Sequence, residues 1–258
     1  MKKIILHLII GLLFSEVCFG ATPEEKRIFK SGESQNTLVE LYTCDGNANG
    51  NPALQWMVSL RQNQKDTDLW EKVIPIAFHA PLWNIAGYKD AFGKKEFDSR
   101  ILEYKKKWSV SNVYCPTMIV NGVEWSGWAR SQPIPVPVDK KNGVLLADGS
   151  KKEDVYEITF KPSKEFEGET FIVYGAMVAF GLKTTPSEGK NRGKVLNQDF
   201  TCLLFRSKDF HLSYGDWVST LELSRPKGLR AQKLGVVFWV TRTNDVRPVQ
   251  VVGGYLPT

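Results

Sequence analysis

Residues 113–125 read VYCPTMIVNGVEW. An Asn-Gly pair stands between two β-rich runs, residues 117–120 and 123–125, and in that setting it is the strongest short-range signal for a β-hairpin. Pro116 comes directly before the first run. The stretch therefore predicts two antiparallel strands that are entered through a proline.

Strand and helix signals alternate in the chain before this hairpin. Residues 37–42 are β-rich, and residues 73–78 are apolar throughout, as in a strand that is covered on both faces. Asn51-Pro52 is typical of a helix start. Apolar residues recur at helical spacing over residues 97–108. The resulting order, β-α-β-α-β-β, predicts an α/β domain with a mixed sheet.

The chain after the hairpin shows β-rich runs without helices between them. Residues 131–137, SQPIPVP, separate this part from the part before it. Alternate prolines remove backbone donors and favour an extended connector. We therefore predict one domain over residues 21–132 and a second over residues 133–258. The second domain is predicted to be an antiparallel β-sandwich, because β-rich runs follow one another there without helices between them. These runs are residues 155–160, 171–180, 200–205, 217–223, 234–241 and 248–255.

The first twenty residues have the pattern of a cleavable signal peptide. Lys2 and Lys3 precede an apolar run over residues 4–14, and small Gly20 precedes the expected cut. We therefore expect a periplasmic or secreted protein. A lipoprotein acylated at Cys18 is the alternative. No later stretch is long and apolar enough to predict a permanent membrane span.

Charge and motifs exclude several classes of function. The formal net charge is +6, and the lysines are scattered in pairs and triplets, as on a solvated surface. No basic-aromatic module predicts nucleic-acid binding. Phosphate-binding loops, nucleophile elbows and zinc-protease motifs are missing from the sequence, so no cofactor is predicted. The partner is expected to be an unidentified envelope protein or peptide.

The sequence resembles a family of secreted bacterial thioredoxin-like proteins of unknown function. The resemblance extends over nearly all of the mature chain and implies a thioredoxin-like domain followed by a β-rich one. It also implies that Pro116 is a cis-proline facing the site of a dithiol. The matching stretches are residues 39–43, 77–79 with Trp83, 87–90, 113–116, 120–122, 190–193 and 248–255.

The departure from this family at residues 47–50 matters most. Family members usually carry Cys-x-x-Cys after the first strand, whereas Asn47 and Gly50 stand at the corresponding positions here. Dithiol exchange needs one thiol to attack and a second to resolve the mixed disulfide. Conventional dithiol catalysis is therefore excluded.

Cys44 and Cys115 are the candidate thiols near the vacated site. Cys44 follows the first strand and Cys115 precedes Pro116, so we expect the two to be close. Three alternatives stay open: a structural disulfide, two reduced thiols packed as small apolar groups, and a redox-active pair. Cys202 lies in an apolar strand and is expected to be a buried, inert thiol.

His79 follows an apolar strand and is expected at its carboxyl end, the usual place for sites in α/β sheets. With Cys44 and Cys115 it would make a ligand set for copper or zinc, although a hydrogen-bonded structural histidine is the simpler interpretation. Trp83 is expected near the same site, where it either lines a groove or belongs to the core.

Two hypotheses of function follow. The leading one is a non-catalytic binding or assembly protein of the bacterial envelope, built on a scaffold that lacks its dithiol, with no catalytic residue assigned. The alternative is a redox or metal-handling protein that uses Cys44, Cys115 and His79.

Overall fold

The computed structural model describes residues 27–63, 68–84 and 88–257 of the chain. Within these residues the protein is built mainly from β-strands, fifteen of them in three sheets, with two α-helices. The predicted signal peptide and Cys18 lie outside the described residues. None of the helices in the described part is long and apolar enough to cross a membrane.

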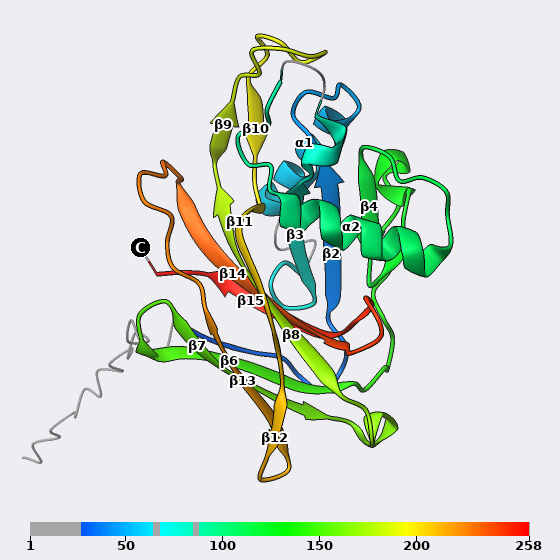
Figure 1. Cartoon of the computed structure of the whole chain (residues 1–258), viewed down its shortest axis with the longest axis vertical. Coiled ribbons are helices and arrows are strands. Elements are labelled where there is room, and N and C mark those ends of the chain that lie inside the picture. The colour runs from blue at the N-terminus through cyan, green and yellow to red at the C-terminus, as the bar shows by residue number, and fades with distance from the viewer. Residues whose placement is uncertain (1–26, 64–67, 85–87, 258) are drawn as a thin grey trace, which may run out of the picture.

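The largest sheet has eight strands and extends through the length of the molecule (Figure 1). Most neighbours are antiparallel, but β2 is parallel to β3, and β3 is parallel to β11. The strands, in their order across the sheet, are β15 (Pro248–Tyr255), β14 (Lys233–Arg242), β8 (Phe171–Phe180), β11 (Thr201–Asp209), β3 (Val73–His79), β2 (Thr37–Thr43), β4 (Thr117–Val120) and β5 (Val123–Glu124).

The expected fold, an α/β thioredoxin-like domain followed by an antiparallel β-sandwich, is wrong. The protein is mostly β-sheet, and its main sheet takes strands from both sides of the connector. The junction is the pairing of Thr201 with Ala77, where the Ala77 N–H also donates to the carbonyl of Phe200 at 2.8 Å. This pairing satisfies backbone groups of β3 that would lie at an open edge if the first half formed a sheet alone. The domain boundary at residues 132–133 stays a prediction that truncation can test.

A second sheet of five antiparallel strands packs against part of the first one. Its alternating burial, with Tyr156, Ile158 and Phe160 pointing inward, produces an apolar layer against β8 and β14. A short third sheet projects at the other end of the molecule. The five-stranded sheet is β1 (Ile28–Lys30), β6 (Gly143–Lys152), β7 (Val155–Pro162), β13 (Asp216–Glu222) and β12 (His211–Ser213), and the short sheet is β9 (Leu182–Thr184) and β10 (Leu196–Gln198).

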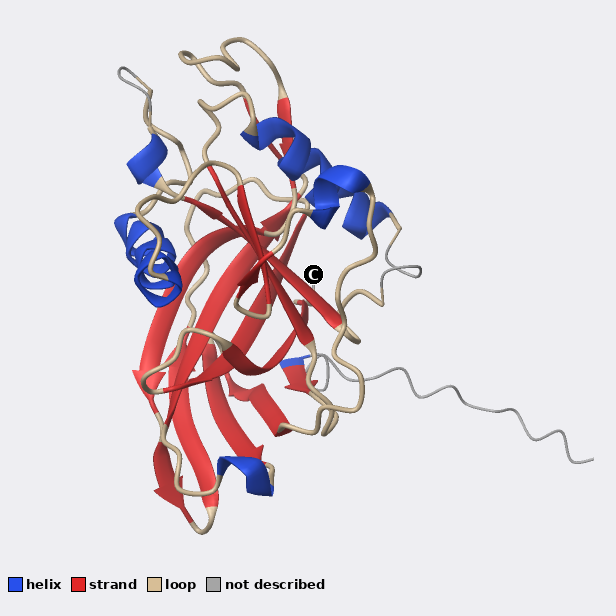
Figure 2. Cartoon of the chain, turned by 90° about the vertical axis from the view of Figure 1, so that its right-hand side faces the viewer, coloured by secondary structure: helices blue, strands red, loops and turns tan. Residues whose placement is uncertain are grey.

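Both α-helices lie at the end of the molecule opposite the five-stranded sheet, as Figures 1 and 2 show. They bury their apolar faces in the larger hydrophobic core, which also contains β2, β3 and β4. The helices are α1 (Gly50–Gln62) and α2 (Lys95–Trp108), and short 3₁₀ turns occur at η2 (Pro81–Trp83), η3 (Gly127–Arg130) and η4 (Lys164–Phe166).

A buried ion pair holds α2 against the large sheet. The Nε of Arg100 lies 2.7 Å from Oε1 of Glu40 on β2, and both side chains are almost fully buried. Tyr104 donates its hydroxyl to the other oxygen of Glu40 at 2.5 Å. The guanidinium of Arg100 also lies 4.9 Å from the ring centroid of Trp239 on β14, so this helix binds to strands from both halves of the chain.

Candidate functional site

The carboxyl ends of the parallel strands β2 and β3 carry the predicted site residues. Cys44 follows β2, His79 ends β3, and Cys115 precedes β4 through a peptide bond to Pro116 that is cis, as the sequence analysis expected. All three of these side chains are buried. We call this group, together with Asp45 and Asp90, the strand-end centre.

Cys44 and Cys115 lie in one buried cluster with Tyr88, and Trp83 packs against it. Both are free thiols. The Cys44 thiol donates to Oδ1 of Asn84 at 3.3 Å, and Sγ of Cys115 lies 4.0 Å from Oγ1 of Thr43. Burial raises the pKa of Cys44 to about 12 and that of Cys115 to about 11. Because the thiolate is the reactive form, the raised pKa lowers the reactivity of both thiols near neutral pH.

Gly50 and Asn47, where the sequence analysis placed the missing dithiol, have structural roles. Gly50 is the first residue of α1, and a Cβ there would lie 2.5 Å from Oγ1 of Thr43. A cysteine at position 50 would therefore require its neighbours to move. Asn47 stands in the preceding turn, where its Oδ1 accepts a hydrogen bond from the Asn49 N–H at 3.0 Å.

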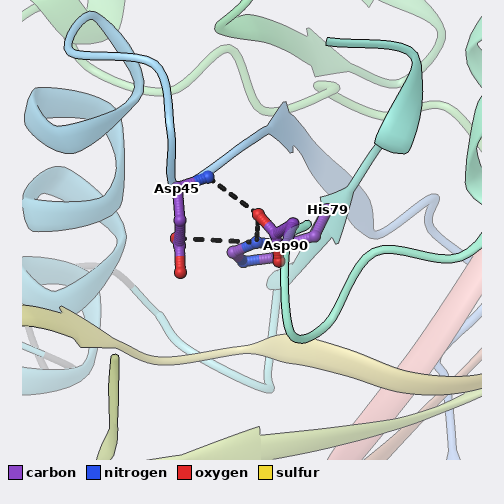
Figure 3. A group of neighbouring side chains, drawn as sticks. All are labelled: Asp45, His79 and Asp90. Carbon is purple, nitrogen blue, oxygen red and sulfur yellow. Dashed lines mark hydrogen bonds and ion pairs between the residues drawn. The ribbon is translucent and has the colours of Figure 1, made fainter. Parts of the chain in front are cut away.

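Two aspartates that the sequence analysis missed lie in contact with His79 (Figure 3). The Nδ1 of His79 is 2.9 Å from Oδ2 of Asp90 and 3.7 Å from Oδ1 of Asp45. Asp90 also accepts the backbone N–H of Asp45 at 2.8 Å and that of Phe92 at 2.9 Å. The side chains of His79 and both aspartates are fully buried. Asp90 therefore joins the end of β2, the end of β3 and its own loop.

Asp45 extends this network to residues 182–198, which we call the arm and which comprise β9, β10 and the loop between them. Gln198 donates to both oxygens of Asp45 at 2.8 and 2.9 Å, and the Thr184 hydroxyl donates at 2.6 Å. Asn191 donates its amide to the backbone carbonyls of Asp45 and Asn47. The arm is thereby attached to the turn that follows β2.

The charges within this network are coupled. Burial alone lowers the pKa of His79, but the carboxylates of Asp90 and Asp45 outweigh burial and raise it. Burial acts to raise the pKa of Asp90, yet the imidazolium of His79 and two backbone N–H groups lower it below its usual value. Burial raises the pKa of Asp45. The centre therefore contains a His79–Asp90 ion pair beside a carboxyl that accepts a proton more readily than usual.

This network does not form a ready cation site, although ligand atoms of Asp45, His79 and Asp90 lie within 4.8 Å of one another. Each carboxylate oxygen already accepts at least one hydrogen bond. A cation would have to displace those donors. The predicted ligand set of Cys44, His79 and Cys115 is not brought together in the same way: among the described residues, only Asp45, His79 and Asp90 have ligand atoms that all lie within 4.8 Å of one another.

A pocket of about 690 Å³ lies away from this centre, between the β4–β5 hairpin, the β14–β15 turn and residues 131–137, which we call the strap. It is within the range of roughly 300–1,000 Å³ that is typical of ligand sites. The hairpin and the turn can be followed in Figure 1. We name this pocket of about 690 Å³ the strap pocket. Its lining mixes apolar side chains with a few charged ones, among them Val123, Trp125, Val136, Phe166, Val249, Lys140, Arg242 and Arg247.

Sequence reasoning placed Cys44, His79 and Cys115 at neighbouring strand ends but missed Asp45, Asp90 and the strap pocket. Asp90 does fall in one of the stretches that carry the family resemblance, residues 87–90, and this was the available signal. Its role could not be inferred, because an aspartate in a turn is usually exposed.

Comparisons with known proteins support the fold but assign no activity. A protein of Agrobacterium tumefaciens, known from a crystal structure, is similar over 88% of this chain and 96% of its own, with 18% identity and a TM-score of 0.51. HBP35 of Porphyromonas gingivalis is similar over 88% of this chain and 76% of its own, with 13% identity and a TM-score of 0.56. No curated protein matches the sequence. Neither structure confirms a thioredoxin-like relationship.

The family model that matches the sequence spans residues 38–241, which include the strand-end centre, the arm and most of the eight-stranded sheet. The chain therefore belongs to the family described as "Protein of unknown function (DUF1223)".

Proposed function

We propose that this protein is a non-catalytic binding protein exported to the bacterial envelope, and that it holds its ligand in the strap pocket. The proposal rests on a difference between the strand-end centre and the strap pocket. Hydrogen bonds close the strand-end centre internally, whereas the strap pocket is open and adjoins an unpaired sheet edge.

The strand-end centre has the properties of a structural core rather than of a catalytic site. A catalytic cysteine needs a lowered pKa and access to its substrate. Burial instead raises the pKa of Cys44 and of Cys115, and the side chain of His79 is fully buried. The third thiol, Cys202, is also buried. These features argue against the alternative of a redox protein.

The strap pocket has the features expected of a binding site. Binding sites are concave and mostly apolar, with a few polar groups that orient the ligand. Val123, which lines the pocket, is 63% exposed, and a few charged side chains also line it. Export is supported by the signal-like pattern of residues 1–20.

A neutral apolar dye, Nile red, tests the proposal because it requires an apolar pocket but no charge. We expect a saturable rise in emission with one site per chain, and at least a tenfold weaker affinity in Val123→Glu. Val138→Glu is the matched control, because Val138 is 84% exposed and does not line the pocket. Loss of affinity in both variants alike, or an absence of saturable binding, would contradict the proposal.

A disulfide-reduction assay on the wild-type protein tests the exclusion of catalysis. We expect no turnover above the uncatalysed rate. Turnover that disappears in Cys44→Ser would instead establish the redox alternative.

A further inference from the structure

We infer that the strap pocket binds the C-terminal end of an extended peptide, whose backbone pairs with β5 and whose terminal carboxylate binds Arg247. This inference rests on the proposed function and names the class of its ligand. Three independent observations carry it: a free sheet edge, an adjacent apolar surface, and an arginine held in place at the end of that edge.

The free edge is β5. Among the described residues this strand pairs only with β4, and it is the last strand of the eight-stranded sheet. The strap runs beside it but cannot complete the sheet, because Pro133, Pro135 and Pro137 have no N–H to donate. Residues 133–139 form no backbone–backbone hydrogen bond within the described part of the chain. An extended peptide can therefore add as a further strand, which is a common mode of peptide recognition.

The apolar surface lies next to this edge. Val123 is 63% exposed and Val136 is 38% exposed, and both side chains line the pocket. Trp125 and Phe166 line the same pocket and are half-buried. Exposed apolar side chains concentrated at one place typically mark an interaction site. They fit the apolar side chains at alternate positions of a bound peptide.

The charge of the pocket favours a ligand with a single negative charge. Three cations line it, Lys140, Arg242 and Arg247, against two anions, Glu124 and Asp245. Asp245 is offset by its bonds to both arginines, at 2.9 Å from Nη2 of Arg242 and 2.6 Å from Nη2 of Arg247. One positive charge is left in excess, so a carboxylate complements the pocket and an ammonium does not.

Arg247 is the side chain that the structure prepares for this carboxylate. Its Nε and Nη2 bind Asp245, which leaves Nη1 without a partner among the described residues. Its aliphatic stem packs on the β4–β5 turn so closely that a Cβ on Gly122 would lie 2.4 Å from Cγ of Arg247. The guanidinium is thus held at the end of β5 while its side chain stays 49% exposed. A group fixed in this way loses little entropy on binding.

The combination of these three features argues against two simpler ligands. A fatty acid would use the apolar surface and Arg247 but would leave the backbone groups of β5 unpaired. An internal peptide segment would use β5 but would bring no carboxylate to Arg247. A peptide C-terminus uses all three features.

Isothermal titration with short peptides on the intact mature protein tests the inference. The probes are an acetylated pentapeptide that ends in leucine with a free carboxylate, the same peptide as its C-terminal amide, and octanoate. We expect the carboxylate peptide to bind at least tenfold more tightly than the amide, and more tightly than octanoate.

Variants at Arg247 show whether the carboxylate binds there. Arg247→Gln is expected to remove the preference for the carboxylate but to retain binding of the amide, and Arg247→Lys is expected to keep part of the preference. Arg206→Gln is the control, because Arg206 is exposed on β11 and does not line the pocket. Urea unfolding of each variant verifies that the fold is intact.

Each outcome of these titrations either supports or overturns the inference. Equal affinity for the carboxylate and the amide would overturn the role of Arg247. Octanoate binding as tightly as the peptide would overturn the peptide itself. In both cases saturable Nile red binding would leave the proposed binding function standing. If neither the dye nor any of these ligands binds, both proposals fail.

Discussion

Asp90 is the residue on which the strand-end centre depends. Its carboxylate accepts three hydrogen bonds, from His79 and from the N–H groups of Asp45 and Phe92, and it is the closest counter-charge of a buried imidazolium. Removing one partner of a buried ion pair leaves the other charge uncompensated, which is more costly than losing an exposed pair.

We predict that Asp90→Asn lowers the free energy of unfolding by about 3–5 kcal/mol, the range that is typical of a broken buried pair. Urea denaturation followed by tryptophan fluorescence measures this change. Asp139→Asn is the matched control, since Asp139 is exposed, and its effect should stay within roughly 0.5 kcal/mol. A small effect at Asp90 would show that the pair contributes little to the fold.

The raised pKa of His79 makes the stability of the protein depend on pH. The folded protein holds this proton more tightly than the unfolded chain, whose histidines titrate near about 6.5. The stabilisation is therefore present below pH ~6.5 and is lost as pH rises through the raised pKa of the folded state. The lowered pKa of Asp90 has the opposite sign, so its contribution is lost as pH falls below about 3.9.

We predict that the free energy of unfolding decreases between pH 6 and pH 8, an interval chosen to lie below the titration of unfolded thiols at roughly 8.5. His79→Gln should remove this decrease. His211→Gln should keep it, because His211 is exposed on β12 and forms no ion pair within the described residues. Identical pH profiles for the wild type and His79→Gln would refute the assignment.

At the scale of elements, the arm is held on the turn after β2 by close backbone contact. The Lys190 N–H donates to the carbonyl of Gly46 at 3.1 Å, and a Cβ on Gly189 would lie 2.7 Å from that same oxygen. Gly189 also has a positive φ of 79°. Only glycine satisfies both conditions without displacement.

We predict that Gly189→Ala separates the arm from this turn, whereas Gly193→Ala does not. Gly193 has a similar φ of 71° but no heavy atom within 4 Å of its added Cβ, so it carries only the backbone strain, roughly 1–2 kcal/mol. Hydrogen exchange measures the difference: the amide of Lys190 should exchange at least tenfold faster in Gly189→Ala than in Gly193→Ala. Equal exchange in the two variants would refute the close contact.

Individual elements could be predicted from the sequence where the signal is local. The run over residues 37–42 is β2, the Asn-Gly pair forms the turn between β4 and β5, and the helical spacing over residues 97–108 belongs to α2. The pairing of β3 with β11 could not be predicted, because more than a hundred residues separate Ala77 from Thr201 and periodicity carries no information about such contacts. This pairing joins the two halves of the chain in one sheet, which the predicted two-domain fold did not contain.

Part of the candidate site could also be predicted from the sequence. The strand ends indicated Cys44 and His79, and the sequence before the hairpin indicated Cys115. The cis-proline was implied only by the family resemblance. The carboxylates could not be found, because burial of an aspartate depends on tertiary contacts such as those of Asp45 with Gln198. The strap pocket likewise is formed by segments that lie far apart in the chain.

At the scale of the whole molecule, the large sheet makes the two halves of the chain depend on each other. Strand β3 lies between β2 and β11, and Arg100 of α2 packs against Trp239 of β14. An isolated first half would expose the edge of β3 and the apolar surface that β8 and β14 cover.

We predict that a fragment of residues 21–132 does not fold cooperatively on its own. Near-ultraviolet circular dichroism and urea unfolding measure this, with residues 21–258 as the reference. A fragment with a sharp unfolding transition and fixed aromatic signals would instead establish the domain boundary predicted at residues 132–133.

Hydrogen–deuterium exchange with and without saturating carboxylate peptide tests most directly where this protein binds. We expect slower exchange in residues 117–125 and 242–249, which border the strap pocket, and unchanged exchange in residues 43–50 and 88–94. Slower exchange at the strand-end centre, with no change around the strap pocket, would contradict this expectation.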